Sequence, residues 1–185
     1  MTSQRADARR NRARILEAAE RVLTEKGTTV STEEIARAAG VGIGTLFRHF
    51  PTKEELIRGV FEDRLRRLAD DAARLATAAD PGAALTGFLR QAVEQSEVKS
   101  ALAGLLTAAG IDLTEAMGDV HSQLLGAMGT LLTRAQATGA VRRDLEVPEL
   151  IGLLAGTSKA VEYAHSPAAR SRILEVVLDG LRPRG

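Results

Sequence analysis

The sequence contains no cysteine, and this absence excludes several classes of function. Without cysteine there is no disulfide framework, no thiol nucleophile and no cysteine-ligated zinc or iron–sulfur site. Histidine is scarce as well: His49, His121 and His165 lie far apart along the chain, which argues against a histidine-rich metal site. We therefore expect neither a metal nor a cofactor.

Long apolar runs are also missing. No run approaches the roughly 18 residues that a membrane span requires, and the basic N-terminus lacks the apolar stretch and cleavage site of a secretory signal. The GxSxG, P-loop and HExxH motifs of common enzyme classes are absent from the sequence. We expect a cytoplasmic protein that is not an enzyme.

What is present is a chain of 185 residues, 44% hydrophobic and 26% charged, long enough for one large or two small domains with their own cores. Its net charge of +1 conceals an asymmetry. Residues 1–53 carry 10 Lys+Arg against 6 Asp+Glu, whereas residues 54–185 carry 15 against 18. The basic end is where a polyanion partner is expected. Arg outnumbers Lys by 21 to 4, which suits phosphate and guanine contacts, although codon bias would produce the same ratio.

Apolar residues recur at helical spacing along almost the whole chain, and no strand-like alternation is sustained. This pattern predicts an all-α fold. Gly, Pro and capping residues mark the breaks. The predicted helices cover residues 10–26, 31–40, 43–50, 52–79, 81–95, 97–109, 113–138, 147–164 and 167–181.

Residues 31–50, STEEIARAAGVGIGTLFRHF, have the pattern of a helix-turn-helix. Ser31 is the expected N-cap of the first helix, with Glu34 at the reciprocal position of a capping box. Gly40 permits the positive φ of a tight turn, and Val41 is placed to fill the gap between the helices. Ile35, Leu46 and Phe50 are predicted to form a small core against residues 10–26. The second helix would then present its N-terminal residues to a major groove.

This string closely resembles the tetracycline-repressor (TetR) family of bacterial transcription regulators. The matching residues are Ile35-Ala36, Ala39-Gly40-Val41, Gly44-Thr45-Leu46, His49-Phe50 and Lys53-Glu54-Glu55-Leu56. The resemblance implies a helix-turn-helix DNA-binding domain over residues 1–52. A long helix would join it to a helical ligand-binding and dimerisation domain over residues 53–185. The chain departs from the family pattern at Gly42, where a serine is usual, and at Phe47, where a tyrosine is usual.

The DNA-binding residues predicted from this motif are Thr32, Ile43, Gly44, Thr45, Phe47, Arg48, His49 and Lys53. Ile43, Thr45 and Arg48 are expected to contact bases, with a solvated short helix as the alternative. His49 and Lys53 are expected to contact phosphates, with a surface ion pair as the alternative. Arg9, Arg10, Arg12 and Arg14 would clamp the DNA backbone or enter a minor groove, unless they form a disordered basic tail.

A small apolar effector is expected inside the second domain. Small residues such as Gly104, Gly126 and Gly129 would leave space there, and methionine can repack around variable shapes. The predicted lining is Phe88, Gln91, Met117, His121, Gln123 and Met128; the alternative is an ordinary packed core. Asp112, Glu115 and Asp119 form an acidic face, for which a solvated surface is preferred over a metal site.

The helices at 147–164 and 167–181 are predicted to build a two-fold homodimer through a four-helix interface. Their apolar stripes exceed what one small bundle must bury, and Gly152 and Gly156 would allow close approach. The stripes comprise Leu150, Leu153, Leu154, Val161, Ile173, Leu174, Val177, Leu178 and Leu181. The two recognition helices would then read a near-palindromic operator.

The sequence therefore predicts a transcriptional regulator, in particular a repressor that a small apolar ligand releases from double-stranded operator DNA. An all-α interaction protein and a ligand-independent DNA-binding protein remain as alternatives. The effector, the operator and the regulated genes are not encoded in any motif.

Overall fold

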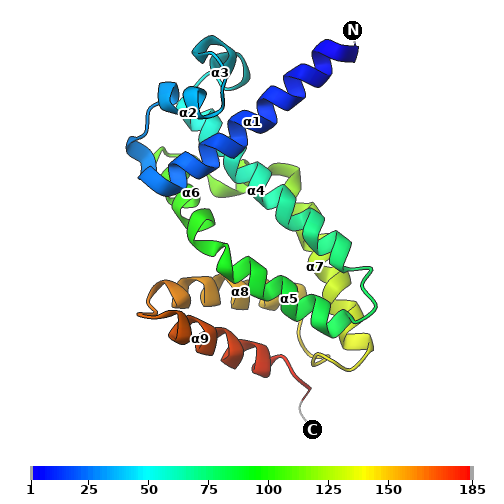
Figure 1. The fold of residues 1–185 in the computed structure, drawn as a ribbon. Coiled ribbons are helices and arrows are strands. Elements are labelled where there is room, and N and C mark those ends of the chain that lie inside the picture. The colour runs from blue at the N-terminus through cyan, green and yellow to red at the C-terminus, as the bar shows by residue number, and fades with distance from the viewer. Residues whose placement is uncertain (1, 184–185) are drawn as a thin grey trace. The chain divides into compact units, whose positions relative to one another are not determined.

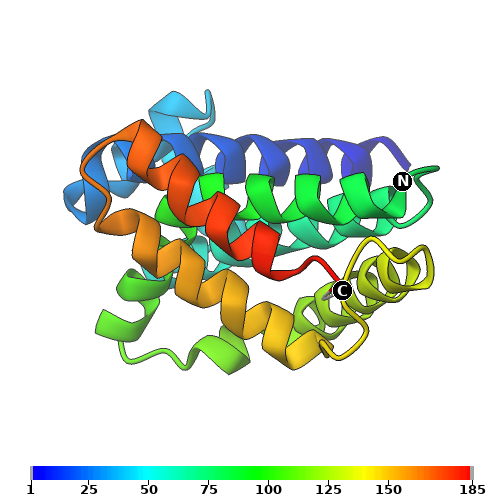
Figure 2. The same ribbon diagram turned by 90° about the horizontal axis from the view of Figure 1, so that it is seen from below.

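The computed structural model describes residues 2–183, with side chains described for residues 6–27 and 29–183. In this part of the chain, helices joined by turns and loops are the regular structure, with no strand (Figures 1 and 2). The helices are α1 (Thr2–Lys26), the 3-10 turn η1 (Gly27–Thr29), α2 (Thr32–Ala38), α3 (Ile43–His49), α4 (Lys53–Leu75), α5 (Pro81–Glu94), α6 (Ser96–Ala108), α7 (Leu113–Ala137), α8 (Val147–Glu162) and α9 (Pro167–Gly180). The all-α prediction is confirmed. None of these helices combines the length and apolarity needed to cross a membrane.

Capping side chains explain where several helices begin. Ser31 accepts a hydrogen bond from the Glu34 amide at 3.2 Å, Thr52 from the Glu55 amide at 3.1 Å and Asp80 from the Ala83 amide at 2.9 Å. Each bond satisfies an amide that has no partner inside the first turn of a helix. The long helix ends at Leu75, before the predicted residue 79, and α1 begins at Thr2, well before the predicted residue 10.

The chain divides into two compact units that do not follow a single cut in the sequence. The first unit contains residues 1–64 and 98–118, and the second contains residues 65–97 and 119–185. Helices α4, α6 and α7 therefore each contribute to both units. In α7 the boundary between the two units falls at Gly118, whose φ of 49° and ψ of −143° interrupt the helix. The sequence did not predict this break, because the apolar spacing continues through it.

The first unit is organised around α1, which packs on α2, while α2 packs on α3. Ile15, Ile35, Leu46 and Leu56 are fully buried there, and Phe50 is almost so. This confirms the predicted core of the helix-turn-helix.

The second unit has a core to which α4, α5, α7, α8 and α9 all contribute. Its fully buried members include Leu85, Phe88, Leu131 and Leu150. Helices α8 and α9 lie side by side, and both contact α5 (Figures 1 and 2). Gln136 secures the α7–α8 connection by donating to the carbonyls of Arg142 and Leu145 at 3.0 and 2.8 Å.

Candidate nucleic-acid interface

The turn between α2 and α3 is fixed by backbone geometry. Gly40 has a φ of 63°, a left-handed conformation that other residues rarely adopt, and the Val41 amide returns to the Ala36 carbonyl at 3.0 Å. The Arg14 guanidinium of α1 lies against the same turn, 3.5 Å from the Gly40 carbonyl oxygen. In the predicted capping box, Glu34 would accept a hydrogen bond from the Ser31 amide. Its carboxylate instead pairs with the Lys26 ammonium. This hydrogen bond raises the pKa of Lys26.

Helix α3 has one buried face and one exposed face. Leu46 is completely buried, whereas Ile43 and Phe47, one turn apart, are 38% and 41% exposed. Gly44 and Arg48 follow them on the same side and are also exposed. An atom added at the Cβ position of Gly44 would meet nothing within 4 Å. The short helix thus presents two apolar side chains, one cation and a bare stretch of backbone, a combination suited to thymine methyl groups, guanine edges and close approach to DNA.

The other predicted DNA-binding residues are less exposed. Thr32, Thr45 and His49 are half-buried, and the His49 ring lies 6.5 Å from the ring of Phe50. Lys53 is half-buried too, and its ammonium donates to the Val30 carbonyl at 2.6 Å. Lys53 thereby ties the start of α4 to the segment before α2, a structural contact that the motif did not indicate.

The arginines before the motif belong to α1, so the alternative of a disordered tail is wrong for residues 9–14. Arg9 and Arg10 are exposed, and Arg10 pairs with Asp7. Arg12 is half-buried, and its guanidinium carbon stands 5.2 Å above the centre of the Phe50 ring. This cation–π contact joins the basic part of α1 to the end of α3.

Gly59 is a structural residue of this interface that the sequence interpretation missed. A Cβ there would lie 2.7 Å from Phe50 Cε1 and 3.3 Å from Leu16 Cδ2, so a side chain cannot be added without displacing its neighbours. Gly59 lets α4 approach Phe50, the last residue of the motif, closely. The only sequence signal was a glycine inside an otherwise good helix.

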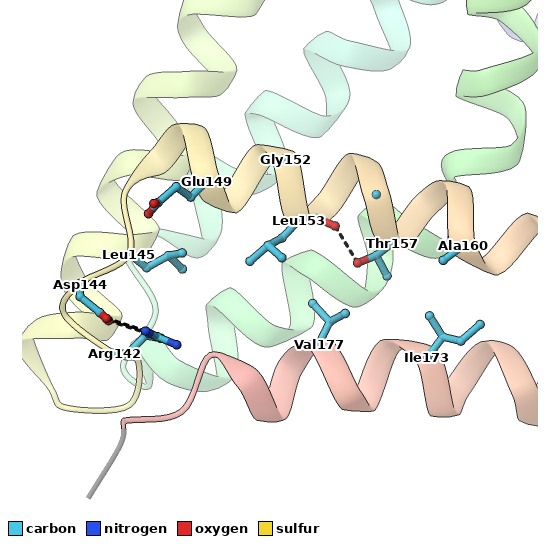
Figure 3. A pocket seen from close by; sticks show the side chains of 11 residues that line it. Arg142, Asp144, Leu145, Glu149, Gly152, Leu153, Thr157, Ala160, Ile173 and Val177 are labelled. Atoms are coloured by element: carbon cyan, nitrogen blue, oxygen red, sulfur yellow. Dashed lines mark hydrogen bonds and ion pairs between the residues drawn. The ribbon is translucent and has the colours of Figure 1, made fainter.

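A second exposed apolar surface lies on α8 and α9 in the other unit. Between these helices is an open groove of about 640 Å³, whose apolar lining includes Leu145, Leu153, Ile173 and Val177 (Figure 3). Leu153 is 41% exposed. Gly152, Gly156 and Ala160 add a flat strip along α8, and Arg142 pairs with Asp144 at one end of the groove (Figure 3). We call this surface the α8–α9 groove.

Two family models match the chain. Residues 15–60 match bacterial regulatory proteins of the tetR family, and residues 80–183 match the C-terminal domain of SbtR-like transcriptional regulators. The chain belongs to the TetR family.

The solved structures of related proteins agree. A TetR transcription regulatory protein from Mycobacterium vanbaalenii is 41% identical, with 97% of this chain and 99% of that chain covered and a TM-score of 0.81. A TetR transcriptional regulator from Streptomyces coelicolor is 35% identical, with 94% and 99% covered and a TM-score of 0.76. This TetR-family chain is a DNA-binding transcriptional regulator.

Curated relatives match a short part of the chain. An HTH-type transcriptional regulator of Staphylococcus aureus strain USA300 is 45% identical over 53 residues, which are 28% of this chain and 29% of that protein. This match says nothing of what an individual member senses.

The residues predicted to hold an effector lie in different surroundings. Phe88 and Met128 are buried in the packed core, and the Gln91 amide donates to Asp71 at 2.8 Å. His121 is half-buried and Gln123 is exposed, while Met117 belongs to the first unit rather than the second. Gly104 and Gly126 are exposed, so the space beside them is solvent rather than an internal cavity. Their binding role remains a prediction.

The acidic residues considered for a metal site have other roles. Asp112 caps α7 by accepting from the amides of Thr114 and Glu115 at 2.7 and 3.0 Å, which lowers the pKa of its carboxyl. Glu115 pairs with Arg58 at 3.4 Å, and Asp119 belongs to the other unit. No cluster of three potential metal ligands exists within the described residues.

Proposed function

We propose that the chain is a repressor that binds its operator through residues 31–50 as a two-fold homodimer, and that a small, largely apolar molecule binding the second unit releases it. The operator DNA of a bacterial regulator lies in the cytoplasm, so we propose that the protein acts there. We assign it no enzymatic activity, since the sequence offers no nucleophile–base set of a recognised type.

The observation that carries the DNA-binding part is the exposed face of α3. Large apolar side chains on a seven-residue helix are expected to be buried, yet Ile43 and Phe47 are exposed beside Arg48. Arg48 is assigned to a guanine edge, and Ile43 and Phe47 to thymine methyl groups or sugars. Thr32, Gly44, His49 and Lys53 would position the helix on the DNA backbone, and Thr45 would contact a base.

The proposed dimer rests on the α8–α9 groove, and the structure changes which residues support it. Leu150, Val161, Leu174, Leu178 and Leu181 are buried within the chain itself, so they are not spare apolar surface as the sequence suggested. The exposed residues of this face are instead Gly152, Leu153, Gly156 and Ala160. A two-fold pairing of this face would space two recognition helices by about 34–36 Å, one turn of the duplex.

The DNA-binding part is tested by selecting duplexes from a random pool at low salt and repeating the binding assay across a salt series. We expect a near-palindromic enriched sequence and an affinity that falls steeply with salt, because bound phosphates release counterions. Failure to enrich any sequence would contradict the proposal.

The packed surroundings of Phe88 and Met128 favour one alternative, a DNA-binding regulator without an effector. A thermal-shift screen of small apolar compounds, followed by operator release with every hit, separates the two. Release by at least one compound supports the ligand-responsive repressor, whereas binding without release supports the alternative.

A further inference from the structure

Helix α3 has few contacts of its own that could fix its direction. Of its seven residues, only Leu46 is buried. Phe50, which directly follows the helix, is 3% exposed, and its amide donates to the Leu46 carbonyl at 2.9 Å. This bond makes Phe50 part of the last turn of α3. The place of the buried Phe50 ring therefore decides how the C-terminal end of α3 is seated.

Two other helices of the first unit hold the Phe50 ring. On α4, Gly59 lies so close that a Cβ atom there would be 2.7 Å from Phe50 Cε1. On α1, the guanidinium carbon of Arg12 stands over the ring, 5.2 Å from its centre. The negative face of an aromatic ring attracts a guanidinium in this position. The ring is thus held by the backbone of α4 and by a cation of α1.

Arg12 differs from the other arginines of the basic part of α1. Arg9 and Arg10 are exposed, whereas Arg12 is half-buried. Among the described residues no carboxylate or carbonyl pairs with Arg12, so its specific contact is the Phe50 ring. A cation–π contact strengthens as the cation loses water, and here no ion pair competes with it.

A second arginine of α1 lies at the opposite end of α3. The Arg14 guanidinium is 3.5 Å from the Gly40 carbonyl oxygen, in the turn that precedes α3. Helix α1 therefore contacts the turn before α3 through Arg14 and the residue after α3 through Arg12. Because the helix between them buries a single side chain, these end contacts govern its orientation.

We propose that Arg12 is a positioning residue for sequence recognition. Through Phe50 it fixes the orientation of α3, on which the base contacts assigned to Ile43 and Arg48 depend, and it contacts neither base nor phosphate itself. This inference rests on the proposed DNA binding through residues 31–50. It gives Arg12 a different role from the backbone clamp or minor-groove contact predicted for it from the sequence.

This role leaves a signature that a phosphate contact does not. Loss of a phosphate contact weakens binding to all duplexes about equally and reduces the slope of log affinity against log salt by about one. Loss of a positioning contact leaves the phosphate contacts in place, so the slope and the affinity for unrelated DNA persist. What falls is the preference for the operator, because the base contacts require an exact orientation of α3.

The test compares the parent chain and Arg12→Ala on two duplexes, the sequence enriched from the random pool and a scrambled duplex of the same composition. Arg12→Ala should weaken binding to the enriched duplex by about tenfold, as expected for a partly desolvated cation–π contact, and leave the scrambled duplex almost unaffected. Arg12→Lys keeps a cation beside the ring and should recover part of the preference. Arg9→Ala is the matched control: it removes an exposed charge from the same helix and should weaken both duplexes equally.

The variant Phe50→Leu shows whether Arg12 acts through the ring. It removes the aromatic face but keeps an apolar side chain. In the Phe50→Leu protein, Arg12→Ala should cause no further loss of preference, because both changes remove the same contact. Circular dichroism verifies the fold of each variant. If Phe50→Leu fails to fold, the comparison of Arg12→Ala, Arg12→Lys and Arg9→Ala decides the matter alone.

Three results would overturn the inference. Arg12→Ala could weaken both duplexes equally with a smaller salt slope, it could leave the preference unchanged, or it could still lower the preference in the Phe50→Leu protein. Failure of the proposed function is seen separately. If the parent chain itself prefers no duplex, DNA recognition fails at the selection step, before any Arg12 variant is compared, and this inference falls with it.

Discussion

The exposed faces of α3 and of the α8–α9 hairpin both present apolar side chains, yet they suit different partners. On α3, Ile43 and Phe47 stand beside Arg48, in a unit whose first helix carries several further arginines. On α8, Leu153 has Gly152 and Gly156 as neighbours, and apolar residues of α9 face it across the groove. Equal exposure of a Phe and a Leu thus carries little information by itself. The surrounding charge and the shape of the surface separate a DNA-reading helix from a protein-docking face.

The largest effect is expected from a charge placed in the α8–α9 groove. Leu153→Arg should convert the dimer to a monomer and weaken operator binding by about 100-fold or more, because two linked half-site contacts become one. Light scattering and a gel shift measure the two effects. Gln123→Arg adds the same charge at an exposed position on α7 and should change neither. A dimeric Leu153→Arg protein would show that the groove is not the interface.

Next in size is the effect of a side chain at Gly59. Gly59→Val should lower the free energy of unfolding by about 1–3 kcal/mol, because its Cβ would overlap the Phe50 ring. The matched control is Gly87→Ala in α5, where nothing lies within 4 Å; it should raise stability by about 0.5–1 kcal/mol. Chemical denaturation measures both. If both changes were stabilising, close packing of α4 on Phe50 would be wrong.

The exposed face of α3 is examined more finely by separating base contacts from phosphate contacts. Arg48→Ala should reduce discrimination at one base pair by about 1–3 kcal/mol. Lys53→Ala should instead weaken binding to all duplexes about equally. Competition binding with single-base operator variants gives both values. A uniform loss for Arg48→Ala would reassign Arg48 to the backbone.

The smallest effect concerns Lys99 on α6. Burial, with Arg64 nearby, lowers the pKa of its ammonium. Between the folded-state pKa and the ordinary value near 10.4, the unfolded chain binds more protons, so stability rises with pH in that range. At neutral pH the buried charge is destabilising. Lys99→Met should therefore be slightly more stable than the parent at pH 7, with the difference shrinking toward pH 10 in denaturation curves. An equal or growing difference at high pH would contradict this account.

Local patterns were sufficient to predict most of the secondary structure. Ser31 caps its helix as expected, and Gly40 has the positive φ that its turn requires. These features depend on interactions within a few residues, which a sequence displays directly. The break at Gly118 was missed because its cause is not local: the apolar spacing of α7 continues through it although the helix changes units there.

The partners of side chains were beyond the sequence. The Glu34 carboxylate was predicted to complete a capping box, but in the folded chain it pairs with Lys26. Lys53 was predicted to contact a phosphate, and its ammonium also donates to the Val30 carbonyl. In the same way, helical periodicity assigned Leu150 and Leu153 to one apolar stripe, and packing buried the first and exposed the second.

Sequence alone thus determined the all-α fold, the helix-turn-helix and the TetR-family resemblance, because periodicity, capping and turn chemistry act over short stretches of chain. Only the tertiary structure decided which apolar residues remain exposed and which carboxylates are already paired. Those properties depend on contacts between residues distant in sequence, and a one-dimensional pattern does not specify which side chains will meet.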